Sequence, residues 1–125
     1  MSVASKIKRS ISSWKGVLAF KVLPLSKRKI VFYVEDDGYW NYSKDIYTAL
    51  QNNFNQEIAY ATSSDSDPML SQPPSGISSF FIGSGIARTF FFAGLEAEIL
   101  VMTMPDLQTF HIKRSPYPVK YVYLH

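Results

Sequence analysis

The first residues whose types and spacing suit chemistry form a glycine turn, Gly83-Ser84-Gly85, followed by Ile86-Ala87-Arg88. The turn separates a short apolar run from a segment with helical spacing of apolar residues, so its N–H groups stand at a predicted helix N-terminus. Such groups hold a phosphate or a carboxylate, and Arg88 adds a positive charge. Arg88 replaces the third glycine of the dinucleotide fingerprint, which disfavours a nicotinamide cofactor. The alternative interpretation is a purely structural turn with Ser84 as a helix cap.

A second group of polar residues, Glu35-Asp36-Asp37, ends the first predicted strand. Ligands of parallel sheets bind at the carboxyl ends of the strands, and a carboxylate there can orient a hydroxyl or act as a base. Glu35 is therefore a candidate catalytic residue, although a solvated turn has the same composition. No histidine adjoins these carboxylates, so we expect no metal.

The third candidate is His111, a possible general base whose tautomer Asp106 would fix. Lys113 and Arg114 beside it would hold a phosphate, whereas the simpler interpretation is an exposed loop histidine. The chain has no cysteine, and it lacks a Gly-x-Ser-x-Gly elbow, a Walker loop and an HExxH helix. Thiol, hydrolase, P-loop and zincin chemistry therefore have no support, and we expect no cofactor.

The elements that must position these residues alternate between strand and helix. Apolar runs at Ser79–Ile82 and Ile99–Met102 flank the amphipathic segment that starts at Ile86, and this βαβ pattern predicts a parallel sheet. The fold expected is a three-layer, Rossmann-like α/β domain with its first strand near the centre, or a flavodoxin-like variant of it. The remaining expected elements are strands at Lys29–Val34, Glu57–Thr62 and Val119–Leu124, a helix from Ser43 to about Asn53, an exposed loop at Ser63–Gly76 and an irregular stretch at Pro105–Pro118.

Residues 1–29 differ in charge from the remainder of the chain. They hold eight of the thirteen lysines and arginines and no acid, whereas residues 30–125 hold five bases and all ten acids. We therefore divide the chain into a basic amphipathic segment, 1–29, and a Rossmann-like domain, 30–125. Since the basic charge is confined to the first segment, we expect no nucleic-acid partner. No apolar run approaches the roughly 20 residues that span a bilayer.

The basic segment is expected to form a helix over Ser5–Phe20. One face carries Ile7, Ile11, Trp14 and Leu18 at spacings of four, three and four, and lysines and serines occupy the other. Such a helix suits an anionic membrane surface or a partner groove, and it can equally pack on the protein's own core.

Three segments, taken in order, resemble the N-terminal part of the CDP-glycerol glycerophosphotransferase family. They are KIVFYVEDDGYWNY, FFIGSGIARTFFFAGLEAEILVMTMPDLQTFHIKRS and the final PVKYVYLH. The resemblance covers about residues 29–125. It implies a half of the two-domain architecture called GT-B and transfer of glycerol phosphate to a cell-wall or surface-polymer acceptor.

The same resemblance implies which half of the enzyme binds each substrate. The second half of such enzymes binds the CDP-glycerol donor, and the first half supplies groups on the acceptor side. The chain ends at His125 on a predicted core strand, so we expect a truncated domain that would bind donor only with the other half and would be inactive alone. His111 and His125 are the histidines that match the family, and the location implied is cytoplasmic or peripheral at the inner membrane face. The alternatives are a stand-alone module for a phosphorylated ligand and a membrane-surface interaction protein.

Overall fold

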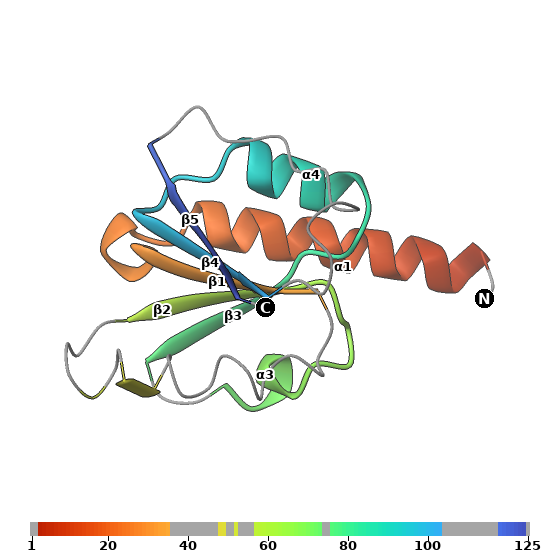
Figure 1. Cartoon of the computed structure of the whole chain (residues 1–125). Coiled ribbons are helices and arrows are strands. Elements are labelled where there is room, and N and C mark those ends of the chain that lie inside the picture. The colour runs from red at the N-terminus through yellow and green to blue at the C-terminus, as the bar shows by residue number, and fades with distance from the viewer. Residues whose placement is uncertain are drawn as a thin grey trace.

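The core of the protein is a five-stranded parallel sheet in the order β3-β2-β1-β4-β5 (Figure 1). The computed structural model describes residues 3–35, 48–49, 52, 57–73, 76–103 and 118–124. β1 lies at the centre, as predicted, and aligns Ile30 with Ile58 of β2 and with Ile99 of β4. The strands are β1 (Ile30–Val34), β2 (Ile58–Thr62), β3 (Ile77–Phe81), β4 (Ile99–Thr103) and β5 (Lys120–Leu124).

This strand order is the Rossmann order and not the flavodoxin-like one, in which β1 would lie between β2 and β3. β3 instead lies outside β2, so the chain crosses from one side of β1 to the other between β3 and β4. The Rossmann-like expectation is confirmed. The crossing makes a topological switch point between β1 and β4, and open sheets of this kind bind ligands beyond the strand ends at such points.

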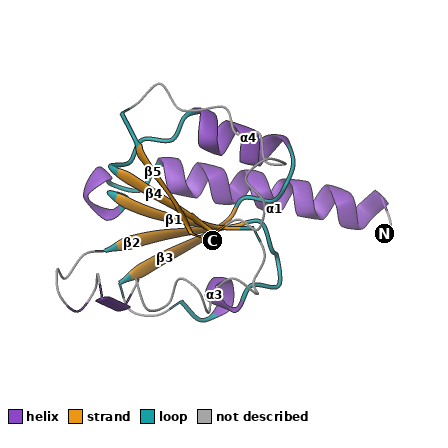
Figure 2. Cartoon of the chain, in the orientation of Figure 1, coloured by secondary structure: helices purple, strands orange, loops and turns teal. Residues whose placement is uncertain are grey.

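Helices cover both faces of the sheet (Figure 2). α1 (Val3–Lys21) and α4 (Ile86–Ala93) lie on one face, where they share a core with Val31, Tyr33 and Leu100. The short α3 (Pro68–Ser71) lies on the other, where Met69 packs with Phe32 and Tyr60. Successive strand residues alternate between these two cores, which is why all five residues of β1 and of β2 are buried.

α1 is packed on the sheet, but not through its most apolar stripe. Ser13, Val17 and Phe20 are its buried residues, whereas Ile7, Ile11 and Leu18 are 54%, 51% and 59% exposed. Of the alternatives left open for the apolar stripe of this helix, packing on the protein's own core therefore does not hold for these three residues. Small residues explain why this side of α1 faces the sheet. At Gly16 the helix backbone touches the carbonyl of Phe81 in β3, and a side with bulky residues would keep the helix farther from the strand.

The predicted exposed loop at residues 63–76 is partly wrong, because it contains the helix α3. The Asp67 carboxylate, which is buried, accepts hydrogen bonds from the Met69 N–H at 2.9 Å and from the Tyr60 hydroxyl at 2.8 Å. An aspartate at the N-cap followed by Pro68 at the first helical position was the signal in the sequence.

Between α1 and β1 the chain makes a single turn of 3-10 helix, η1 (Leu25–Lys27). Of the helix predicted from Ser43 to about Asn53, Thr48, Ala49 and Asn52 are described, and they are helical. The other residues of that prediction lie outside the described part of the chain.

Candidate functional site

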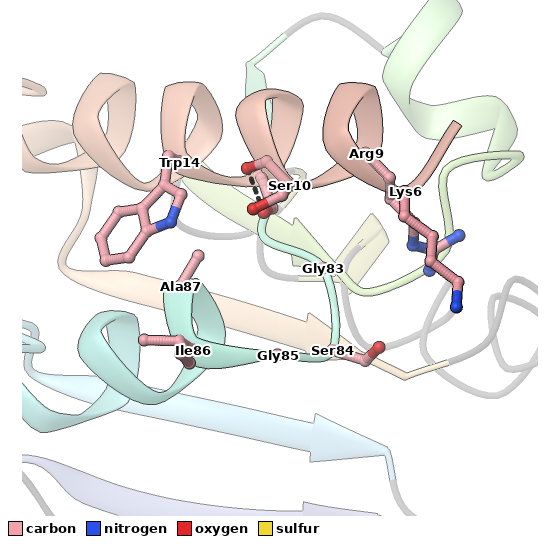
Figure 3. A pocket seen from close by; sticks show the side chains of 10 residues that line it. Lys6, Arg9, Ser10, Trp14, Gly83, Ser84, Gly85, Ile86 and Ala87 are labelled. Carbon is pink, nitrogen blue, oxygen red and sulfur yellow. Dashed lines mark hydrogen bonds between the residues drawn. The ribbon is translucent and has the colours of Figure 1, made fainter. Parts of the chain in front are cut away.

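A pocket of about 320 Å³ lies between α1 and the turn that joins β3 to α4 (Figure 3). It stands at the carboxyl edge of the sheet, where the βαβ pattern placed function. Its walls come from two segments whose nearest lining residues, Trp14 and Gly83, are 69 positions apart in the chain. The lining residues are Lys6, Arg9, Ser10, Ser13, Trp14, Gly83, Ser84, Gly85, Ile86 and Ala87.

The floor of the pocket is the glycine turn. Gly83 has a φ of +69°, a left-handed conformation that side chains rarely adopt, and a Cβ on it would lie 2.8 Å from the Cβ of Ser13 in α1. Both the conformation and the close approach of the helix therefore require glycine. Ser84 and Gly85 follow on the surface, and no side chain caps the start of α4 among the described residues.

A chain of hydrogen bonds fixes this turn from below. The Ser63 hydroxyl donates to the carbonyl of Gly83 at 2.5 Å, and it lies 2.6 Å from the Tyr33 hydroxyl. A serine has one hydroxyl proton, so Tyr33 must be the donor to Ser63. Arg88 in turn donates to the Tyr33 oxygen at 3.3 Å. Successive hydrogen bonds therefore connect the Arg88 guanidinium to Tyr33 of β1, Tyr33 to Ser63 at the end of β2, and Ser63 to the turn after β3.

Two cations of α1, Lys6 and Arg9, lie over the turn that carries Ser84 (Figure 3). Arg9 is held by Asp65 at 3.0 Å and by the Ser63 carbonyl at 3.1 Å, and its guanidinium lies 5.4 Å from the centre of the Phe81 ring. Arg9 therefore fastens α1 to the end of β2, and Asp65 offsets much of its charge. Lys6 has no carboxylate partner within the described residues, so it supplies the pocket with positive charge.

The first N–H groups of α4 have no carbonyl of their own helix to pair with, and the helix dipole adds positive potential there. Together with Lys6 and the Ser84 hydroxyl they make a pocket suited to an anion such as a phosphate ester. The described residues contain no group of histidines and carboxylates able to hold a metal ion.

The pocket unites some of the predicted site residues and omits others. Gly83, Ser84 and Gly85 line it, but Arg88 does not, because its guanidinium turns toward Tyr33. Glu35 stands half-buried at the end of β1, near enough to Tyr33 to act on its pKa. His111, Lys113, Arg114 and His125 lie outside the described residues, so their roles stay predictions.

Sequence reasoning missed Lys6 and Arg9, which supply the charge. Their spacing of three places them on neighbouring turns of one helix. Nothing in the spacing of the chain, however, says that this helix lies over the glycine turn.

Burial raises the pKa of the Tyr33 hydroxyl above its ordinary value, against the hydrogen bond to Ser63 and the charge of Arg88, and the Glu35 charge adds a smaller rise. The folded protein thus keeps this proton to a higher pH than the unfolded chain. Its contribution to the free energy of unfolding is intact below a pH of about 10 and is lost as the pH rises through the folded pKa.

We expect Tyr33→Phe to make the alkaline fall of that free energy shallower by up to about 1.4 kcal/mol per pH unit. Urea unfolding at several pH values between 8 and about 11.5 measures the slope. An unchanged slope in the variant would show that Tyr33 does not titrate differently in the two states.

Comparison with known proteins gave no match to this chain among family models, curated proteins or solved structures. Fold and site define a Rossmann-like α/β domain with a basic pocket at the carboxyl edge of its sheet. None of the described helices is both long enough and apolar enough to cross a membrane.

Proposed function

We propose that this domain binds the phosphate of a phosphorylated ligand in the pocket between α1 and the glycine turn. The observation that carries the proposal is the convergence of Lys6, Ser84 and the N-terminus of α4 on one cavity. Backbone N–H groups at a helix N-terminus and a lysine ammonium are both donors that phosphate sites use. The volume of about 320 Å³ suits a small phosphate ester such as glycerol phosphate.

We further propose that the domain is the acceptor-side half of a GT-B-type enzyme related to the CDP-glycerol glycerophosphotransferases. The Rossmann strand order and the position of the turn at the carboxyl edge support this, and the resemblance of residues 29–125 supplies the substrate class. On this proposal the acceptor is a glycerol-phosphate polymer end, Glu35 or His111 supplies the base, and the donor CDP-glycerol is bound by another half. A stand-alone module for a phosphorylated ligand would use the same pocket.

The test is a titration of the full chain with glycerol 3-phosphate, followed by the amide NMR signals of Ser84, Gly85 and Ile86. We expect these signals to shift with glycerol 3-phosphate and not with glycerol, because the pocket donors contact the phosphate. Lys6→Gln should weaken binding about fivefold, since one charge-assisted contact in a partly exposed pocket contributes about 1 kcal/mol.

Lys15→Gln is the matched control, because Lys15 is exposed on the same helix and does not line the pocket. It should leave the affinity within about a factor of two, as only long-range charge is lost. Equal losses in the two variants, or shifts with glycerol alone, would contradict a phosphate site here. Binding of CDP-glycerol much tighter than glycerol 3-phosphate would place the donor in this half and overturn the acceptor-side assignment.

A further inference from the structure

α1 and α4 expose neighbouring apolar residues. On α1 these belong to the apolar stripe that the sequence shows, in which Trp14 is half-buried against the core, and on α4 they are Ile86 and Phe90, which are 70% and 55% exposed. We call this set the apolar face: Ile7, Ile11, Trp14, Leu18, Ile86 and Phe90.

The apolar face is continuous from one helix to the other. The rings of Trp14 and Phe90 lie 5.4 Å apart between their centres, and Trp14 and Ile86 line the same pocket. α1 and α4 run side by side on the same side of the sheet (Figure 1). Single exposed apolar residues need no explanation, but a contiguous patch across two helices marks an interaction surface.

Lysine side chains of α1 border the apolar face. α1 carries Lys6, Lys8, Arg9, Lys15 and Lys21 and no acid. Lys8 and Lys15 are exposed, are separated by two helical turns and border the apolar face on the side away from α4. A partner for this surface must therefore offer both an apolar layer and negative charge close to it.

We propose that the apolar face docks onto an anionic lipid bilayer. Ile7, Ile11 and Leu18 would enter the boundary between headgroups and acyl chains, with α1 lying in the membrane plane, and Lys8 and Lys15 would contact lipid phosphates. An exposed apolar stripe bordered by lysines, on a helix without acids, is the distribution typical of helices that lie in the interface of an anionic membrane. The proposal does not depend on the phosphate pocket, because the side chains that would enter the bilayer or contact its phosphates do not line that pocket.

The experiment is co-sedimentation of the full chain with vesicles of neutral phosphatidylcholine and with vesicles that contain 30% phosphatidylglycerol. We expect binding to the anionic vesicles at least tenfold above that to the neutral ones. Lys8→Gln/Lys15→Gln should weaken it roughly thirtyfold, from the attraction of two cations near an anionic surface. Lys27→Gln/Lys120→Gln removes the same charge at exposed sites away from the face and should weaken it less than threefold.

A second pair of double variants tests how much the apolar face contributes to vesicle binding. Ile11→Gln/Leu18→Gln changes exposed side chains of the apolar face, and we expect a loss of at least tenfold with unchanged circular dichroism. Ser12→Gln/Ala19→Gln, exposed on the same helix outside the apolar face, is the control and should bind as the parent does.

Three results would overturn the proposal, two of them from binding and oligomeric state and the third from fluorescence. One is binding that is equal on neutral and anionic vesicles or absent from both. The other is a dimer in solution, detected by light scattering, that Ile11→Gln/Leu18→Gln dissolves while vesicles go unbound, since a second copy would then be the occupant. With Trp40→Phe leaving Trp14 as the single tryptophan, bound protein should show a blue-shifted emission quenched by brominated lipid. No quenching would also contradict insertion at this face.

Discussion

Gly16→Ala should lower the free energy of unfolding by about 3 kcal/mol or more. A Cβ at Gly16 would lie 1.8 Å from the carbonyl oxygen of Phe81 and 2.8 Å from its carbonyl carbon. These are backbone atoms of β3 and cannot swing away as the end of a side chain could. The helix must therefore lift off the sheet, which exposes Val17 and Phe20 and opens the pocket between α1 and the glycine turn.

The destabilisation expected for Gly16→Ala is opposite in sign to the effect of the intrinsic helix propensities of glycine and alanine. Inside an unpacked helix, replacing glycine by alanine stabilises by about 1 kcal/mol. Urea unfolding of Gly16→Ala beside the parent measures the difference, and a stabilising result would show that α1 does not lie on β3. Gly85→Ala is the matched control, because its φ is −107° and nothing lies within 4 Å of the added Cβ. It should lower the free energy of unfolding by no more than about 1 kcal/mol, because Gly85 is the N-cap of α4 and alanine is a poorer cap than glycine.

The strands could be predicted from the sequence because they are buried on both faces. Runs such as IVFYV at 30–34 and IAYAT at 58–62 are apolar, β-branched or aromatic at nearly every position, and turn residues limit them. The order of the strands could be anticipated only in part. Local patterns placed β1 near the centre, but they do not say whether β3 lies beside β2 or beside β4. Contacts between distant segments decide that.

Only the part of the site that has a local sequence signature could be predicted, because contacts between distant segments bring in the rest. The glycine turn has a local signature, and Gly83, Ser84 and Gly85 do line the pocket. Lys6 precedes Gly83 by 77 positions in the chain, so only the packing of α1 shows that it lies at the turn. Arg88 was expected to serve the turn directly. It lies in the first turn of α4 and donates to Tyr33 instead, so it acts on the glycine turn through Tyr33 and Ser63.

The buried side of α1 could not be predicted from its apolar spacing, because the most hydrophobic side of the helix is not the side that comes closest to the sheet. The buried side holds Ser13 and Gly16, small residues that let the helix backbone approach β3, and only Val17 and Phe20 fill the core. A reading based on apolar spacing selects the stripe through Ile11 and Leu18, which is the more hydrophobic side but not the buried one.

The orientation of α1 on the sheet predicts different effects on stability for substitutions at Phe20 and at Leu18. Phe20 is 2% exposed, and the centre of its ring lies 4.8 Å from that of Phe91 and 5.6 Å from that of Phe80. Leu18 is 59% exposed. We expect Phe20→Ala to lower the free energy of unfolding by about 3–5 kcal/mol, through lost burial and the cavity left in the core. Leu18→Ala should change it by less than about 0.5 kcal/mol. Urea denaturation of both variants measures the contrast. A loss at Leu18 as large as that at Phe20 would mean that the helix is rotated, and the apolar face would then be buried and closed to a membrane.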